Sequence, residues 1–190
     1  MRKTMNKLKS TLIIAIVIAS ALPLMAQRKR ISPHETISSV IDGNKVTIVY
    51  GRPYSKDPKT GEVRKIWGTL VPYGKVWRTG ADEAKLLTTE QPVVMGGTTV
   101  PAGTYSLFTL PAADGTAKLI VNKKTGQWGI PYKEQSEATN ELARIDLKKA
   151  ALDKTVDQFT MAIDQNPSGG GVLKMMWENT RFSVPFTVKK

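Results

Sequence analysis

The sequence contains no cysteine and a single histidine among its 190 residues. Without cysteine there is no disulfide framework and no thiol chemistry, so the fold must be stabilised by a hydrophobic core. The single histidine, His34, excludes a metal site built from several histidines of one chain. A serine hydrolase triad would have to use His34, and no G-x-S-x-G motif is present. The sequence therefore predicts no metal site and no cofactor.

A phosphate-binding loop is also absent. Gly169-Gly170-Gly171 is followed by Val172 and Leu173, whereas a P-loop needs Lys and then Ser or Thr at this point. Residues 165–171 (QNPSGGG) lie between two strand-like runs, which is typical of a flexible hairpin connection.

Residues 1–26 have the three-part pattern of a secretory signal peptide. Met1 to Lys9 contains basic residues and no acid, Thr11 to Leu22 is apolar, and Ala26 is a small residue at the end. The apolar run is shorter than the roughly 20 residues that span a bilayer. No cysteine follows it, which excludes a lipid anchor on cysteine. We therefore expect cleavage after Ala26 and export to the periplasm or the extracellular medium, with no membrane span in the mature chain.

Basic residues outnumber acidic ones in the rest of the chain. The sequence has 28 Lys and Arg against 16 Asp and Glu, and four of the basic residues precede Ala26, so the mature net charge is 28 − 4 − 16 = +8. This balance suits a small polar or anionic ligand or an acidic glycan, although it also serves solubility. Because the chain is exported and has no compact basic tract, we expect no nucleic-acid partner. The sequence predicts no particular oligomeric state.

Turn signals recur every 8–12 residues or so between short runs of alternating polarity. Asp42-Gly43 is a strong hairpin signal, and Gly96-Gly97 marks a second hairpin. Residues 104–110 are apolar on both faces, which predicts an interior strand. The pattern predicts an all-β fold, an antiparallel β-sandwich with jelly-roll or Greek-key-like connections. By its length, 27–190 should be a single domain.

Four local features complete the predicted fold. Residues 133–142 have helical composition and predict one short helix of one or two turns. Leu173 to Trp177 and Phe182 to Phe186 are predicted as separate strands, and Pro185 places the second of them at a sheet edge. Tyr105, two residues after a glycine at a strand start, is similar to the tyrosine corner of β-sandwiches.

The densest cluster of polar and aromatic groups is Trp77-Arg78-Thr79-Gly80-Ala81-Asp82-Glu83. Trp77 could stack on a sugar ring, Arg78 could grip a carboxylate or phosphate, and Thr79-Gly80 could let a ligand approach the backbone. The structural alternative places Trp77 in the core and pairs Arg78 with Asp82 or Glu83. The ligand-binding candidates are Arg52, Trp77, Arg78, Thr79, Asp82, Glu83 and Trp128, with His34, Asn122 and Glu178 as weaker candidates.

Two of these candidates leave alternatives open. Adjacent residues of a strand point to opposite faces, so Asp82 and Glu83 make a poor acid/base pair for glycoside hydrolysis, and Glu178 would be needed as a partner. Trp128 lies between glycines and is either a mobile lid or a plug on the core.

Several motifs resemble the family called domain of unknown function 2911, which occurs in exported bacterial proteins. The matching segments are SPHET at 32–36, YGRP at 50–53, LVPYGKVWRTGA at 70–81, VPAGTYSLF at 100–108, NK at 122–123, QWG at 127–129 and WENT at 177–180. The resemblance implies export and a domain covering nearly the whole mature chain, and it implies no activity. Family members typically have Asn where this chain has Asp82, and residues 55–62 are longer than the usual link.

Three functions follow as hypotheses. The first is a module that binds a small polar or carbohydrate-like ligand through Trp77, Arg78, Asp82 and Arg52. The second is a hydrolase of envelope glycans using Asp82, Glu83 or Glu178. The third is a structural or protein-interaction domain of the envelope. A hollow that gathers Arg52, Arg78 and Asp82 would favour binding, and two facing carboxylates would favour hydrolysis.

Overall fold

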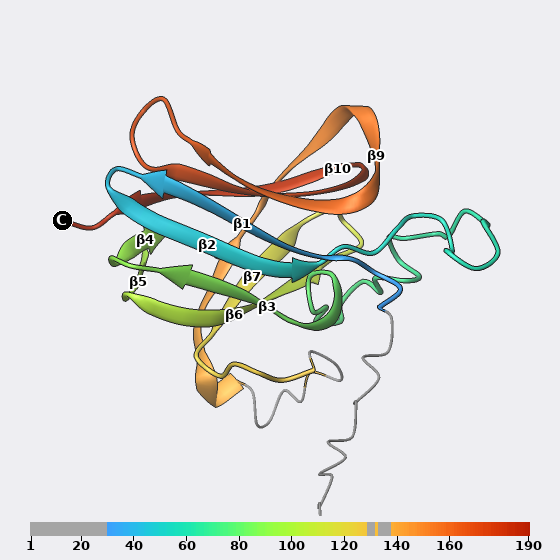
Figure 1. The fold of residues 1–190 in the computed structure, drawn as a ribbon, viewed down its shortest axis with the longest axis horizontal. Helices are drawn as coiled ribbons and strands as arrows, with labels where there is room; N and C mark the ends of the chain where they lie inside the picture. Colours follow the sequence, from blue (N-terminus) through green and yellow to red (C-terminus); the bar gives the residue numbers. More distant parts are fainter. Residues whose placement is uncertain (1–29, 129–131, 133–137) are drawn as a thin grey trace, which may run out of the picture.

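Two antiparallel sheets packed face to face make up the computed structural model, which describes residues 30–128, 132 and 138–190 (Figure 1). The first sheet has the order β1 (His34–Ile41), β2 (Asn44–Gly51), β3 (Ala81–Thr89), β6 (Gly103–Pro111), β7 (Ala117–Asn122) and β8 (Glu141–Asp146). The second has the order β5 (Thr98–Val100), β4 (Val93–Met95), β10 (Gly171–Val188) and β9 (Lys148–Gln165). The predicted all-β sandwich is confirmed.

The predicted turns lie where the sequence signals placed them. Asp42-Gly43 joins β1 to β2, with Ile41 paired to Asn44. Gly96-Gly97 joins β4 to β5. Strand β6 runs between β3 and β7, so the interior strand is confirmed. The Tyr105 hydroxyl donates to the carbonyl oxygen of Pro101 at 3.1 Å, as in a tyrosine corner.

The C-terminal part differs from the prediction. Leu173 to Phe186 belongs to one strand, β10, whose pairing with β9 shifts register around Glu178. These bulges bend the strand without ending it, which is why the sequence suggested two strands. Strand β10 lies between β4 and β9, so the prediction that Pro185 marks an edge is wrong. Pairing with β9 ends at Ser183 and pairing with β4 begins at Phe186, so the missing N–H of Pro185 interrupts neither ladder.

Helix is almost absent from the described residues. Of the segment predicted as a short helix, Ala138–Asn140 forms a single 3-10 turn, and Glu141 already begins β8. Residues 133–137 of that prediction, and the predicted signal peptide, lie outside the described residues. Among the described residues, no helix has the length and apolar character needed to cross a membrane.

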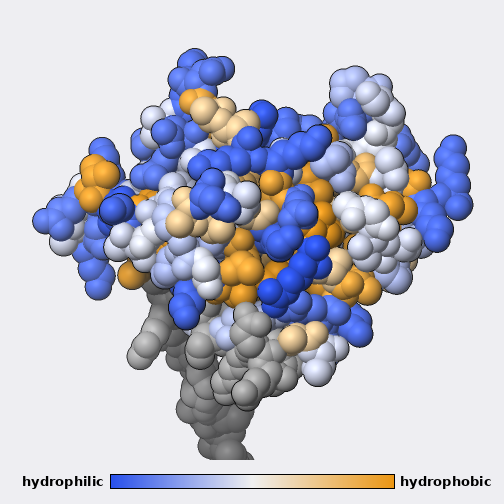
Figure 2. Space-filling model, turned by 180° about the vertical axis from the view of Figure 1, so that it is seen from behind, coloured by the Kyte–Doolittle hydropathy of each residue, from blue (hydrophilic) through white to orange (hydrophobic). Residues whose placement is uncertain are grey.

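Aromatic side chains fill the space between the sheets at one end of the sandwich. The ring of Trp77 stacks on that of Trp177 with centroids 5.8 Å apart, and Phe159 meets both rings edge-on. Trp77 is 9% exposed and Trp177 only 1%. Trp77 is therefore a core residue, as the structural alternative proposed. On the surface seen from behind, apolar residues show in patches between hydrophilic ones (Figure 2).

Candidate functional site

Residues 78–84 leave the pairing with β6 and form a polar loop from the cluster that the sequence singled out, while Ala81 still pairs with Gly51 of β2. Trp77 bridges to Thr109, and Lys85 pairs with Leu107. The seven residues between Trp77 and Lys85 therefore stand opposite a single residue of β6, Phe108. Thr79 and Asp82 adopt positive φ angles of 58° and 64° within this excursion. Such conformations are costly for residues with a side chain and persist only where the surroundings hold them.

Thr79 is one of the groups that hold the loop. It is fully buried, and its hydroxyl lies 2.7 Å from that of Thr109. At Gly80, a Cβ atom would lie 2.5 Å from the carbonyl oxygen of Gly51 and 2.5 Å from Cε of Lys85. Thr79 therefore packs against its own chain, whereas Gly80 also lines the larger hollow described below.

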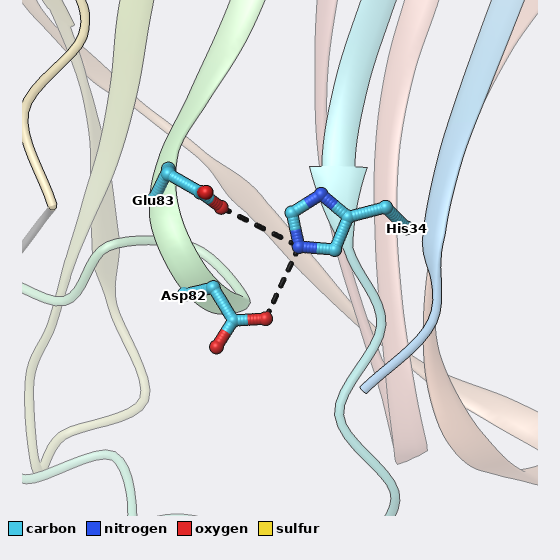
Figure 3. Close-up of side chains that lie close together, drawn as sticks. All are labelled: His34, Asp82 and Glu83. Carbon is cyan, nitrogen blue, oxygen red and sulfur yellow. Dashed lines mark hydrogen bonds and ion pairs between the residues drawn. The ribbon is translucent and has the colours of Figure 1, made fainter. Parts of the chain in front are cut away.

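His34, Asp82 and Glu83 converge near the end of this loop, where β3 begins (Figure 3). The imidazole Nε2 of His34 lies 3.1 Å from Oδ2 of Asp82 and 3.5 Å from Oε2 of Glu83. The expectation that these adjacent carboxylates point to opposite faces is wrong. The positive φ of Asp82 breaks the strand alternation, so both carboxylates face the same ring.

Gly51 allows this convergence across an intervening strand. His34 begins β1 and the carboxylates begin β3, and Gly51 at the end of β2 pairs with His34 on one side and with Ala81 on the other. A Cβ atom at Gly51 would lie 3.1 Å from Nε2 of His34 and 2.5 Å from the carbonyl oxygen of Ala81. The missing side chain thus lets the imidazole reach across β2.

Arg30 completes the cluster, and the sequence analysis did not single it out. Its guanidinium donates to both carboxylate oxygens of Glu83 at 2.7 Å, and its Nη1 lies 2.5 Å from Nε2 of His34. The hydrogen bond from Arg30 is the main reason that the pKa of Glu83 lies below its usual value. Within the basic run 28–30, nothing in the sequence marks Arg30 over its neighbours.

Lys85 is a second residue that the sequence analysis missed. Its side chain is 1% exposed, and its ammonium donates to the carbonyl oxygens of Ala81 and Glu83, the latter at 2.6 Å. Burial, and then the charge of Arg78, lowers the pKa of Lys85 to about 7. The sequence contains a usable signal, because Lys85 shares the inward face of β3 with Leu87.

A hollow of about 350 Å³ opens beside the cluster, and we call it the arginine hollow. Its lining includes Arg64, Arg78, Asp82 and the aromatic pair Trp77 and Trp177. Across the His34 cluster lies a smaller hollow of about 210 Å³, lined in part by His34, Glu83 and Lys85. Asp82 faces the first hollow and Glu83 the second, so the cluster separates them.

Arg78 has unused hydrogen-bonding capacity in the arginine hollow. It is half-buried, which lowers its pKa, and its Nε donates to the carbonyl oxygen of Gly80 at 3.2 Å. Among the described residues, no carboxylate lies within 4 Å of its guanidinium. The alternative in which Arg78 pairs with Asp82 or Glu83 is therefore not found.

Arg52 lies apart from this site. Its guanidinium pairs with Glu35 at 3.1 Å and donates to the carbonyl oxygen of Phe159 and the hydroxyl of Thr160. Arg52 thus ties the first sheet to β9 and lines neither hollow.

The remaining candidates are also elsewhere. Asn122 is buried and bonds to the Tyr132 hydroxyl and the Lys124 backbone, which stabilises the turn after β7. Glu178 sits at the β10 register shift, where burial raises its pKa, and lines neither hollow. Trp128 is 58% exposed, so it does not plug the core.

A family model described as "Protein of unknown function (DUF2911)" matches residues 32–186. The match includes His34, Arg78, Asp82 and Glu83 and begins after Arg30. No curated protein and no solved structure matches the chain. These matches assign no chemistry to the site.

Proposed function

The chain belongs to the DUF2911 family, whose description names no activity, and we propose that its arginine hollow binds a small anionic, carbohydrate-like ligand. The observation that carries this proposal is the half-buried guanidinium of Arg78, which faces a hollow and contacts no carboxylate among the described residues. A planar guanidinium that faces a hollow can bind a carboxylate or a phosphate group through two parallel hydrogen bonds.

The rest of the lining suits the same ligand. A volume of about 350 Å³ lies within the range of small-molecule sites. Arg64 adds a second guanidinium, and Asp82 can accept hydrogen bonds from sugar hydroxyls. The Nε of Arg64 and the Nε1 of Trp177 are buried donors without a partner among the described residues.

The hydrolase alternative receives less support from this geometry. The facing oxygens of Asp82 and Glu83 lie within 4.8 Å of each other, which is well short of the about 6.5–9.5 Å of inverting glycosidases and slightly below the about 5–5.5 Å of retaining ones. Both carboxylates already contact His34, and Glu83 also binds Arg30. Glu178, the third carboxylate considered, is not part of this cluster.

A ligand screen tests the binding proposal. We expect a sugar uronate at 100 times its dissociation constant to add about 2.7 kcal/mol to the apparent free energy of unfolding of the chain 27–190. The matching neutral sugar should add much less, because it lacks the charge that pairs with Arg78. Thermal shift measures both, with inorganic phosphate as a further probe of anion binding.

Two variants locate the effect. Arg78→Ala should abolish the uronate shift while the protein stays folded, whereas Arg144→Ala, which removes a guanidinium engaged with Glu141 far along the sheet, should keep it. Equal shifts for the neutral and acidic sugars, or a shift that survives Arg78→Ala, would contradict the proposal.

Export is part of the same proposal, since envelope glycans are a source of acidic sugars. The supporting observation is the basic, apolar and small-residue pattern of residues 1–26. Full-length protein expressed in a bacterium should be recovered from the periplasm or the medium with Gln27 as its first residue. N-terminal sequencing of the recovered protein checks this, and an intact Met1 on cytoplasmic protein would contradict it.

A further inference from the structure

We propose that His34, Asp82 and Glu83 bind one divalent transition-metal ion. Each residue offers one ligand atom, and the three atoms lie within 4.8 Å of one another. The three side chains point toward one another from the starts of two strands that are not neighbours, β1 and β3 (Figure 3). Gly51 of β2 lies between these strand ends. The proposal does not depend on the sugar ligand of the arginine hollow.

The spacing of the ligand atoms suits a metal ion. Metal–nitrogen and metal–oxygen bonds of roughly 2.0–2.2 Å place neighbouring ligand atoms about 3.0–3.5 Å apart in octahedral or tetrahedral geometry. The Nε2 of His34 lies 3.1 Å from the nearer oxygen of Asp82 and 3.5 Å from that of Glu83. Both distances fall in this range before any side chain moves, and the third, between the two carboxylate oxygens, is no more than 4.8 Å.

A positive group already lies against the cluster. The Nη1 atom of Arg30 lies 2.5 Å from Nε2 of His34 and 2.7 Å from Oε2 of Glu83, so it contacts two of the three ligand atoms. The cluster therefore already attracts a cation to His34 and Glu83, although this one does not contact Asp82. Arg30 is exposed, so it can swing away when an ion binds.

The hydrogen bonds of His34 also favour an ion over the arginine. Nη1 of Arg30 lies 3.0 Å from Nδ1 and 2.5 Å from Nε2 of the same ring. An atom this close to both ring nitrogens lies over the face of the imidazole, so Arg30 does not use the in-plane lone pair of Nε2. A metal ion on Nε2 needs a lone pair on that nitrogen alone and leaves Nδ1–H free to donate to water.

The ligand set indicates which ions bind. One imidazole nitrogen with two carboxylate oxygens suits Zn²⁺, Mn²⁺ or Fe²⁺, whereas Ca²⁺ and Mg²⁺ prefer oxygen ligands throughout. Three protein ligands leave at least one position open for water or another molecule. Because Asp82 also lines the arginine hollow, the ion would lie at the edge of that hollow.

Titration with the metal alone tests the proposal. Chain 27–190 without a histidine tag is stripped with chelator, and Zn²⁺ binding is measured by calorimetry and Mn²⁺ binding by electron paramagnetic resonance. We expect one ion per chain. His34→Gln, Asp82→Asn and Glu83→Gln should each weaken binding by about tenfold or more, with an unfolding curve that shows the variant is folded.

Arg30→Gln separates the metal site from a purely structural clamp. It removes the competing cation, so it should strengthen metal binding several-fold. Asp146→Asn, at an exposed carboxylate paired with Lys118, should leave the affinity unchanged. The proposal is overturned if the wild-type protein binds no metal, if binding survives His34→Gln, or if Arg30→Gln binds more weakly. Arg30 would then be a purely structural clamp onto β3. A negative result would leave the sugar-binding proposal unaffected, because these metal titrations contain no sugar.

Discussion

Replacing Trp177 with alanine should lower the free energy of unfolding by about 3–5 kcal/mol, the usual range for a fully buried large aromatic. Trp177 is 1% exposed, stacks on Trp77 and meets Phe159 edge-on with centroids 5.7 Å apart. Truncation removes these contacts and leaves a cavity between the sheets. Since a domain is stable by only about 5–15 kcal/mol, this loss is a large fraction of the total.

Trp128→Ala is the matched control for this prediction. The same substitution at a side chain that is 58% exposed should change the free energy of unfolding by no more than about 0.5 kcal/mol. Urea unfolding followed by circular dichroism measures both variants, and Trp177→Phe gives a milder loss if Trp177→Ala does not fold. Similar losses for Trp177→Ala and Trp128→Ala would show that the tryptophan cluster does not stabilise the sandwich.

Raising the pH from 7.5 to 9.5 should increase the free energy of unfolding by about 2 kcal/mol through Lys85. Burial lowers the pKa of folded Lys85 to about 7, with a further lowering from Arg78 and Arg30 and an opposing effect from Asp82 and Glu83. The unfolded lysine keeps its proton until about pH 10.4. Between these values the unfolded state binds more protons, so stability rises with pH.

Lys85→Met should flatten this dependence. Urea unfolding at several pH values between 7.5 and 9.5 gives the slope for both proteins. Tyr50 does not interfere, because burial and its hydrogen bond to Glu35 raise its pKa to about 12, above the window. A wild-type protein whose stability is constant or falls across the window, or a slope that persists in Lys85→Met, would contradict the assignment.

The sequence predicted the scaffold well because its signals are local. Asp42-Gly43, Gly96-Gly97 and the apolar run at 104–110 each specify a turn or a strand through a few adjacent residues, and all were confirmed. The continuity of β10 was missed because a bulge around Glu178 looks like a strand end in sequence. The polar loop beginning at Arg78 was also found locally, as a dense cluster of functional groups.

The composition of the site was harder to predict because it depends on distant residues. Arg30, His34 and Glu83 meet only because β2 lies between β1 and β3 and ends in Gly51, which has no side chain. The alternation rule separated Asp82 from Glu83, and it failed because the positive φ at Asp82 is invisible in the sequence. A count of histidines argued against a metal site, yet it considered only sites with several histidines.

The position of His34 in the first sheet has a kinetic consequence. Strand β1 is an edge strand, and His34 forms its terminal pair with Gly51. The ends of edge strands open locally at a small fraction of the cost of global unfolding. Fraying of this one end would carry the imidazole away from Asp82 while the sandwich stays intact. The lifetime of the assembled cluster is therefore set by the opening of a single strand end, and an occupant that joins His34 to Asp82 would slow that opening.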